Sequence, residues 1–262
     1  MNKNRNNLKK ELAFKLCVAG YSFKIVLNDR DMFEIIKQRY EEFSTNTREN
    51  VTLDFHLEKS KKIYYIPRKD FEKKLIKLKV NSDMMKKIFN NQVYGFNNFL
   101  ASIIYYWLFR KNIITLHASG VIRNGKAFIF PGPSETGKTT IAKLSAGKIM
   151  NDNEIIIKKI GKEYFAYASP FQRRDIKPKN IKASIKGIFF LKGKNKNKII
   201  KLKNENAFNE LIKNQYPHKM SYENKGDLKI LLNWGNTISE KIPSYKISFK
   251  IGENIWRMLD EI

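Results

Sequence analysis

One short segment of the chain has the residue types and the spacing of a phosphate-binding loop. The pattern is glycine, four residues, glycine, lysine and then serine or threonine, and its members here are Gly132, Pro133, Ser134, Glu135, Thr136, Gly137, Lys138 and Thr139. In such a loop the glycines let successive backbone N–H groups point at phosphate oxygens. The lysine neutralises the β- and γ-phosphates, and the last hydroxyl can ligate Mg²⁺. The segment, with Thr140 beside it, is therefore predicted to bind a nucleoside triphosphate, ATP, together with Mg²⁺.

The flanking sequence favours this interpretation over a chance Gly-Lys-Thr in a lysine-rich chain. An apolar strand is expected at 127–130, before the loop, and a helix at 139–146, after it, with Gly147 as the residue that ends the helix. The N-terminus of that helix carries a positive partial charge and would face the same anion. Residues 121–123 are expected to pair with 127–130 as a hairpin, because Asn-Gly between apolar runs is a strong turn signal.

The acidic partner that a magnesium site needs is not at its usual place. Ordinary P-loop enzymes carry a second aspartate that helps to hold the metal. The two later apolar strands that the sequence predicts, 185–191 and 228–232, end in Lys192 and Asn233, neither of which is acidic. The remaining candidate is Asp152, which directly follows the predicted helix.

Asp152 could reach the loop through a compact βαβ unit. If residues 148–150 form a strand parallel to 127–130, the two strands and the helix make such a unit with a right-handed crossover. Parallel strands end at the same edge of a sheet, so Asp152 would lie beside the loop. There it could bind Mg²⁺ or accept a proton from an attacking hydroxyl. The alternative is a solvated aspartate in a turn.

His117 is a second candidate for chemistry. It follows a predicted strand, 113–116, at an edge where a site could form. Histidine is the usual partner in proton transfer, although a lone histidine beside an apolar strand is more often structural. His56 and His218 have no comparable context.

The sequence LHASGVIRNGKAFIFPGPSETGKTTIAKLSAGKIMNDNEIIIKK, followed by Ser-Pro-Phe at 169–171, resembles the HPr kinase/phosphorylase-like family. That family shares its nucleotide site with ATP-dependent phosphoenolpyruvate carboxykinase. The resemblance is close over residues 113–171, extends more loosely to the C-terminus, and leaves most of the first 90 residues uncovered. It implies that Lys138 and Thr139 hold the nucleotide and the metal, that Asp152 is the catalytic base, and that His117 stands near the transferred phosphoryl group.

The chain departs from the family at one position. The family usually has two adjacent acidic residues where this chain has Asp152 and Asn153. Glu154 is one step further and, on a strand, would point away from position 153. A second carboxylate contact to the metal therefore does not follow from the resemblance.

We expect an α/β fold with two domains. Residues 91–262 would form a P-loop domain with a mixed β-sheet, of the HPr kinase/phosphoenolpyruvate carboxykinase-like type, and residues 1–90 a small α+β domain, a candidate for acceptor recognition. The other expected elements are strands within 12–28, a helix capped by Asp29, strands at 51–57 and 62–66, a helix at 83–111, hairpins at 160–161 and 193–197, a helix at 205–214 and a strand at 245–251.

Charge is the dominant bulk property. The chain has 51 basic and 25 acidic residues, a net charge of +26, which attracts phosphates, nucleic acid and acidic proteins alike. Compositional drift toward Lys and Asn explains the same charge. The cluster Arg173, Arg174 and Lys177 suits phosphate or carboxylate binding but is also typical of a solvated loop. The lysines between 192 and 203 have no interleaved aromatic residue, so a stacking platform for single-stranded nucleic acid is not expected.

Composition also bears on the cellular setting. Cys17 is the only cysteine, which excludes an internal disulfide and favours a reducing, cytoplasmic environment. The longest apolar stretch, 99–109, is about half of what a bilayer span requires. We therefore expect a soluble, cytoplasmic protein without a membrane span, and a homo-oligomer is compatible with the sequence.

The favoured function is an ATP-dependent kinase that transfers the γ-phosphoryl group to a hydroxyl, with serine of a protein or peptide as the acceptor that the resemblance implies. The basic surface would suit an acidic acceptor. Two alternatives stay open. One is a non-enzymatic ATP-binding regulator, acting on nucleic acid through the positive charge. The other is a carboxykinase acting on a small organic acid.

Overall fold

The computed structural model describes residues 11–58, 71, 73–81, 94–133, 135–171, 179–192, 196–216, 225–250 and 255–262. Over this part of the chain the architecture is mixed α/β. Two compact units, Met1–Phe96 and Asn97–Ile262, are distinguished by their internal contacts. Their boundary falls inside helix α3 (Tyr94–Phe109), close to the position near residue 90 that the sequence suggests.

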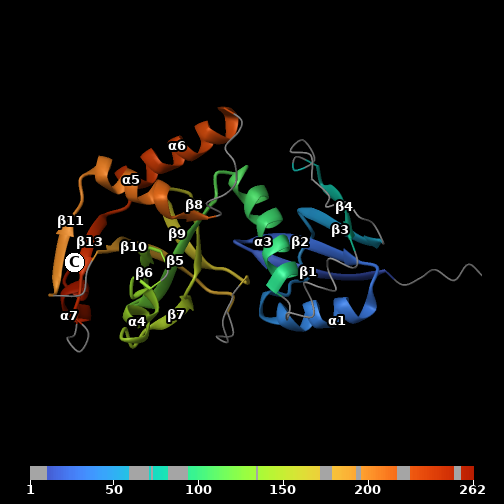
Figure 1. The fold of residues 1–262 in the computed structure, drawn as a ribbon, viewed down its shortest axis with the longest axis horizontal. Helices are drawn as coiled ribbons and strands as arrows, with labels where there is room; N and C mark the ends of the chain where they lie inside the picture. The colour runs from blue at the N-terminus through green and yellow to red at the C-terminus, as the bar shows by residue number, and fades with distance from the viewer. Residues whose placement is uncertain are drawn as a thin grey trace, which may run out of the picture. The chain divides into compact units, whose positions relative to one another are not determined.

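Unit 1 is a four-stranded sheet with one described helix. Its elements are β1 (Leu12–Val18), β2 (Tyr21–Leu27), α1 (Arg30–Arg39), the short 3-10 helix η1 (Glu41–Phe43), β3 (Val51–Glu58) and β4 (Leu75–Asn81) (Figure 1). The strand order is β1-β2-β3-β4. The first pair is antiparallel and the next two pairs are parallel.

The helix of unit 1 forms as its sequence predicts. The Asp29 carboxylate accepts a hydrogen bond from the backbone N–H of Met32 at 3.0 Å, which caps the helix start. Met32, Phe33 and Ile36 are buried on one face, whereas Ile35 is exposed. The predicted cap is therefore confirmed.

Strand β4 was not predicted, although its signal is present. Ile76, Leu78 and Val80 are buried and alternate with exposed lysines, which is the period of a half-buried strand. The strand expected at 62–66 lies outside the described residues.

Unit 2 contains α3 and a nine-stranded sheet. Its other elements are β5 (Ile114–Arg123), β6 (Lys126–Pro131), α4 (Lys138–Lys143), β7 (Lys148–Asn151), β8 (Glu154–Ile160), β9 (Glu163–Ala168), β10 (Lys182–Leu191), β11 (Lys198–Lys201), α5 (Asn204–Asn214), β12 (Gln215–Tyr216), α6 (Lys225–Lys241), β13 (Ser244–Ser248) and α7 (Ile255–Asp260).

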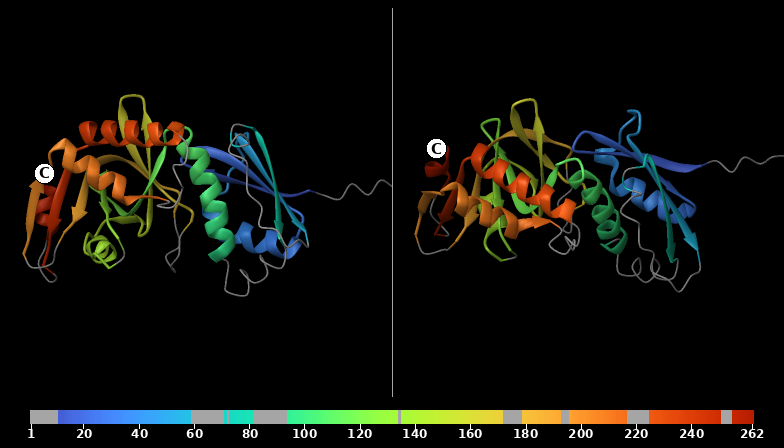
Figure 2. Two further views of the ribbon diagram at one scale, coloured as in Figure 1. Left: turned by 45° about the horizontal axis from the view of Figure 1, so that its top comes forward. Right: turned by 90° about the horizontal axis from the view of Figure 1, so that it is seen from above.

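The main path of this sheet is β11-β13-β10-β6-β5-β8-β9, and β7 and β12 also pair with β5. The start of β10 pairs with β9 as well, so β10, β6, β5, β8 and β9 form a closed ring of pairings. Helices α5 and α6 lie side by side, and α4 lies apart from them, in contact with β5 (Figures 1 and 2). Strand β5 pairs with other strands along both of its edges and is therefore central to the sheet.

Two predicted hairpins are confirmed. Strands β5 and β6 meet at Asn124 and Gly125, whose φ angles of 50° and 73° are those of a type I′ turn. Strands β8 and β9 meet at Gly161 and Lys162. The strands expected at 113–116 and 121–123 are one continuous strand, β5.

Other expectations are wrong. The hairpin at 193–197 does not form, because β11 pairs with β13 rather than with β10. The expected strand 228–232 lies inside α6, where Leu231, Trp234 and Ile238 are buried at helical spacing. The short run of apolar residues misled the prediction because it contains less than two helical turns. Helix α7 was not predicted.

The two remaining helices and the last strand agree closely with expectation. Residues 205–214 fall within α5, and the helix expected over 83–111 is observed as α3, with residues 82–93 outside the described part of the chain. The strand expected at 245–251 is β13, and residue 251 is not among those described. No helix in the described ranges is long and apolar enough to cross a bilayer.

Candidate functional site

Strand β5 joins the segments that the sequence singled out. His117 is not beyond the end of a strand, as expected, but inside β5. Its backbone carbonyl accepts a hydrogen bond from the N–H of Gly132 at 3.2 Å, where the glycine-rich loop (residues 132–139) begins. The next residue, Ala118, donates its N–H to the carbonyl of Asn153 at 3.0 Å. The loop and the turn around Asp152 therefore flank the same two residues of β5.

The two flanking strands run in the same direction. Strands β6 and β7 are each antiparallel to β5, with Pro131 opposite Ala118 and Asn151 opposite Gly120. The two strands are therefore parallel to each other, as expected, with β5 between them. Their carboxyl ends still reach the same level of the sheet, which is the arrangement the prediction required.

The glycine-rich loop closes around the ammonium group of Lys138. This group donates hydrogen bonds to the carbonyls of Gly132 at 2.7 Å and Pro133 at 2.6 Å, and the residue is only 6% exposed. Thr136 donates its hydroxyl to the same Pro133 carbonyl at 2.9 Å. Gly137 has a φ of 99°, a conformation that favours glycine. The backbone thus wraps the lysine within the loop that carries it.

A buried serine fixes the start of α4 to the sheet. The Ser119 hydroxyl, which is fully buried, donates to the backbone carbonyl of Lys138 at 3.1 Å. Residues two apart on a strand share a face, so His117 and Val121 lie on the same face of β5 as Ser119. Val121 packs in one core cluster with Ile141 of α4, which identifies this as the face that α4 covers.

Asp152 sits in a turn that Asn151 shapes. The side-chain oxygen of Asn151 accepts from the N–H of Asn153 at 2.8 Å and from the N–H of Glu154 at 3.0 Å, and its amide donates to the carbonyl of Ser169 at 3.0 Å. Such an Asx arrangement fixes the backbone on either side of the intervening aspartate. Asp152 is 6% exposed, so it is not a solvated turn residue.

Glu154 is the centre of a buried network that the sequence did not reveal. Its carboxylate accepts from the hydroxyl of Tyr105 at 2.5 Å and from that of Ser169 at 3.2 Å, and the residue is 1% exposed. The amide of Asn153 also reaches it, at 3.3 Å, so these neighbours do not point apart as they would on a strand. In the antiparallel pairing of β5 with β8, Glu154 lies directly opposite His117. Directly opposite residues share a face of a sheet, so Glu154 belongs to the same face as His117.

Ser169 links this network to the Ser-Pro-Phe segment. Its hydroxyl lies 2.5 Å from that of Tyr105 and accepts the N–H of Phe171 at 3.0 Å. The ring of Phe171 packs edge-on against the ring of Tyr105. The one signal in the sequence was the Ser-Pro-Phe segment itself. Tyr105 gave none, because it lies in an apolar helix far from these residues in the chain.

Comparison with known families assigns the chain. Residues 84–262 match the family described as SynChlorMet cassette protein ScmC. The chain belongs to this ScmC family. The match contains every candidate site residue named above and leaves out strands β1 to β4.

Comparisons with individual proteins add little. No curated protein matches the chain. The Hpr(Ser) kinase/phosphatase from Coxiella burnetii matches with 13% identity and a TM-score of 0.31, over 56% of this chain and 91% of that one. This match is too loose to support an argument about fold.

The other predicted residues of this ScmC-family chain take varied positions. Thr139 and Thr140 are half-buried at the start of α4, and Pro133 and Glu135 are exposed. Ser134, Arg173, Arg174, Lys177 and His218 lie outside the described residues, and His56 is on β3, where it contacts Asp54. Within the described ranges, no three His, Cys, Asp or Glu side chains gather to hold a metal ion.

Gly147 has a different role from the predicted one. Helix α4 ends at Lys143, and Ala146, not Gly147, takes the left-handed conformation, with a φ of 52°. A Cβ at Gly147 would lie 2.6 Å from the carbonyl oxygen of Ile122. Glycine at this position allows the chain to pass closely over β5.

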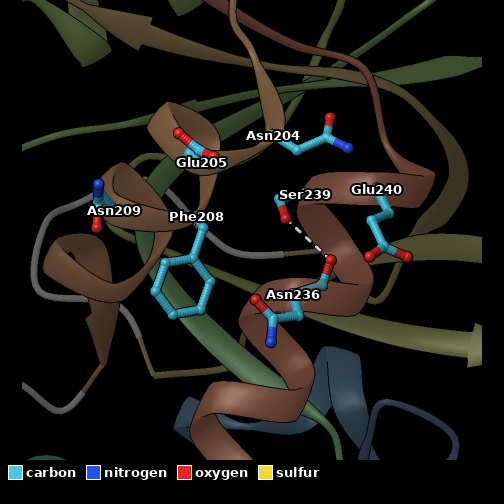
Figure 3. A pocket seen from close by; sticks show the side chains of 7 residues that line it. All are labelled: Asn204, Glu205, Phe208, Asn209, Asn236, Ser239 and Glu240. Atoms are coloured by element: carbon cyan, nitrogen blue, oxygen red, sulfur yellow. Dashed lines mark hydrogen bonds between the residues drawn. The ribbon is translucent and has the colours of Figure 1, made fainter.

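A separate cavity of about 410 Å³ lies between α5 and α6 (Figure 3). It is lined by Asn204, Glu205, Phe208, Asn209, Asn236, Ser239 and Glu240. The hydroxyl of Ser239 is bonded to the carbonyl of Asn236 at 2.9 Å. None of the candidate residues at β5 lines this cavity.

Proposed function

We propose that this chain is an ATP-dependent kinase that transfers the γ-phosphoryl group of ATP to a hydroxyl, the serine of a protein or peptide. The observation that carries the proposal is the placement of two buried charged residues beside one part of β5. The loop that wraps Lys138 and the turn that contains Asp152 bond to adjacent residues of β5, through Gly132 and Asn153. A cation and a carboxylate kept out of water at one place on a sheet are typical of a reaction centre.

The residues fit the groups that this function requires. The ammonium group of Lys138 and the backbone N–H groups of a glycine-rich loop are the groups that bind phosphate oxygens. The hydroxyl of Thr139 and the carboxylate of Asp152 are oxygen donors, which Mg²⁺ prefers, and Mg²⁺ commonly keeps waters and phosphate oxygens as its other ligands. Thr139 and Asp152 would hold the metal, and the loop from Gly132 to Thr140 would hold the phosphates.

The proposed roles of the side chains follow from their chemistry. When bound, ATP supplies the phosphoryl group and Mg²⁺ offsets its negative charge. Lys138 neutralises the β- and γ-phosphates. Asp152 accepts the proton of the acceptor hydroxyl, whose oxygen bonds to the γ-phosphorus while ADP leaves. His117, on the α4 face of β5, stands near the transferred group. Residues 1–90 would contribute to recognition of the acceptor.

Transfer of label from ATP tests the proposal. The full chain is incubated with γ-labelled ATP, Mg²⁺ and fractionated cell extract, beside Asp152→Asn and a control, Glu163→Gln, at an exposed position on β9. A general base contributes about a hundredfold to ten-thousandfold to the transfer step. We expect a labelled protein band from the wild type and the control, and a loss of that size in single-turnover rate for Asp152→Asn.

The same experiment separates the two roles of Asp152 and the main alternative. If Asp152 chiefly holds Mg²⁺, raising the Mg²⁺ concentration restores both binding and transfer. Equal rates in wild type and Asp152→Asn would mean that this residue is not the base. The second candidate is a non-enzymatic ATP-binding switch, which is favoured by Asn153 standing where the resembled family usually has a second acidic residue. Binding by the wild type without transfer to any acceptor would support it.

A further inference from the structure

Helix α4 is very short, and its carbonyl groups near the C-terminal end need partners. In a regular helix the carbonyl of Ile141 would accept the N–H of Ser145, four residues later. Ser145 instead donates its N–H to Ala142 at 3.2 Å. The indole N–H of Trp256, from α7, donates to the Ile141 carbonyl at 3.0 Å. A side chain more than a hundred residues away thus caps the helix that follows the glycine-rich loop.

A second side chain caps the turn after α4. Arg123, at the end of β5, donates one guanidinium N–H to the carbonyl of Ser145. Two further donors of the same guanidinium bind the carboxylate of Asp260 on α7, at 2.7 and 2.5 Å. The guanidinium also lies over the ring of Trp256, at 5.5 Å. A cation is favourable beside the C-terminal end of a helix, and here α7 holds that cation in place.

The opposite end of α4 is supported by the same part of the chain. Phe249, fully buried after β13, packs beneath Gly137, the residue that caps the start of α4. A Cβ at Gly137 would lie 3.1 Å from the tip of this ring. The ring of Trp256 meets the rings of Phe128 and Phe130 edge-on, at 5.3 and 5.6 Å, beneath the strand that leads into the loop. Both ends of α4 are therefore held by residues from 249–260.

We infer that Phe249, Trp256, Asp260 and Arg123 form a clamp that positions the glycine-rich loop for nucleotide binding, with Trp256 as its main positioning residue. The inference rests on the proposed function. The loop and α4 share residues 138 and 139, so a tilt of the short helix displaces the backbone N–H groups that would face phosphate. At the far end of the helix the clamp binds the carbonyls of Ile141 and Ser145.

The test compares two identical substitutions at buried tryptophans of the full chain. Trp256→Phe keeps a ring and removes the N–H that caps Ile141. Trp234→Phe makes the same change on α6, at a residue that is 6% exposed. Affinity for Mg·ATP is measured by calorimetric titration well below the melting temperature, and melting is measured without nucleotide. We expect about fivefold weaker binding for Trp256→Phe, the size of one lost hydrogen bond, and unchanged binding for Trp234→Phe.

A second variant covers the case in which Trp256→Phe does not fold. Asp260→Asn, at a partly exposed position, releases Arg123 and should weaken binding by about threefold. Asp260→Glu, which keeps the charge, should restore it. A purely structural role for α7 would lower the melting temperature and leave affinity unchanged, and that result overturns the inference. Failure of the wild type to bind any nucleotide would overturn the proposed function itself, and this inference with it.

Discussion

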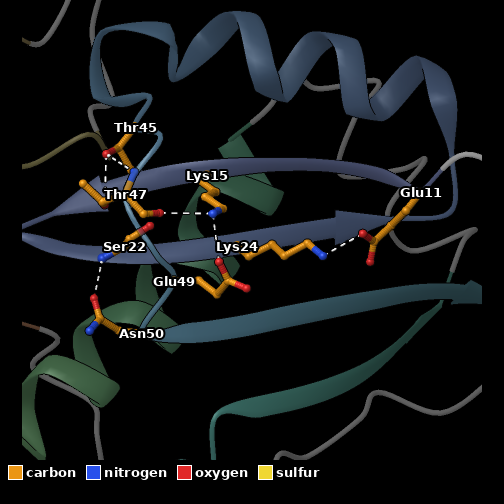
Figure 4. A network of polar contacts seen from close by, with 8 residues as sticks. All are labelled: Glu11, Lys15, Ser22, Lys24, Thr45, Thr47, Glu49 and Asn50. Carbon is orange, nitrogen blue, oxygen red and sulfur yellow. Dashed lines mark hydrogen bonds and ion pairs between the residues drawn. The ribbon is translucent and has the colours of Figure 1, made fainter.

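Each unit of the chain contains a polar network, and the two networks differ in how far they are removed from water. In unit 1, Lys15 on β1 binds the carbonyl of Thr47 at 3.1 Å and the carboxylate of Glu49 at 2.8 Å (Figure 4). Lys24 binds Glu11 at 2.6 Å. The side chains of Lys15 and Glu49 are 31% and 37% exposed. In unit 2 the carboxylate of Glu154 is almost fully enclosed by its partners.

The contrast extends beyond these pairs. Among the described residues of unit 1, Ser22 is the one buried polar residue. The neighbourhood of β5 in unit 2 holds a set of them: Ser119, Lys138, Asn151, Asp152, Glu154 and Ser169. Exposed networks fasten loops at little cost, because water satisfies any group that loses its partner. A buried polar network is destabilised when any of its groups loses its partner, because an unpaired polar group is costly in the protein interior. A fold that concentrates buried polar groups at one place has a use for them there, which is why we place the site in unit 2.

The largest effect on stability is expected when the buried carboxylate of Glu154 is removed. Glu154→Ala removes the carboxylate that accepts from the hydroxyls of Tyr105 and Ser169. One of these hydroxyls can still donate to the other, so one buried donor loses its acceptor. We expect a loss of about 3 kcal/mol in the free energy of unfolding, since each unsatisfied buried group costs about 1–3 kcal/mol. Urea denaturation measures it. A loss below about 0.5 kcal/mol would show that water enters the network and that the two regions do not differ.

A smaller effect is expected from one partner of that carboxylate. Tyr105→Phe removes a single hydroxyl and keeps the ring that packs on Phe171. The expected loss is about 1–2 kcal/mol in the free energy of unfolding. Combined with Glu154→Gln in a double-mutant cycle, the two substitutions should be non-additive by more than about 0.5 kcal/mol. Additivity would mean that the short contact between the two side chains contributes nothing to the free energy of unfolding.

The smallest effect is expected in unit 1. The hydrogen bond from Lys15 lowers the pKa of Glu49. A lowered pKa in the folded state stabilises the protein above the ordinary glutamate value, and the contribution is lost as the pH falls through the folded value. Glu49→Gln should therefore change the melting temperature less than Tyr105→Phe at pH 7. The difference from wild type should disappear in acid, and a difference that grew in acid would contradict the assignment.

The sequence predicted those features whose cause is local. The Asp29 cap, the Asn124-Gly125 turn and the glycine-rich loop each depend on neighbours in the chain, so residue types and spacing were sufficient. The burial of Asp152 was not predictable, because it depends on how β5, β7 and β8 pair.

The missed features depend on distant contacts. Tyr105 and Glu154 are 49 residues apart in the chain, and Trp256 and Ile141 are 115 apart. Nothing in an apolar helix distinguishes the tyrosine that will meet a carboxylate from the one that will not. The prediction of a strand at 228–232 was wrong for a related reason. The buried face of α6 can be recognised only over a stretch of sequence longer than 228–232.

The most direct test of the central claim is a calorimetric titration of the full chain with ATP and Mg²⁺, run on wild type and on Lys138→Ala. Lys138 is the one side-chain cation that the loop pattern fixes, and its ammonium group lies against the loop carbonyls. Matched circular dichroism spectra and melting curves show whether the variant is folded, and Lys143→Ala, further along α4, serves as the control. The account predicts saturable binding by wild type and control and no measurable binding by Lys138→Ala. Undiminished affinity in a folded Lys138→Ala variant would contradict it.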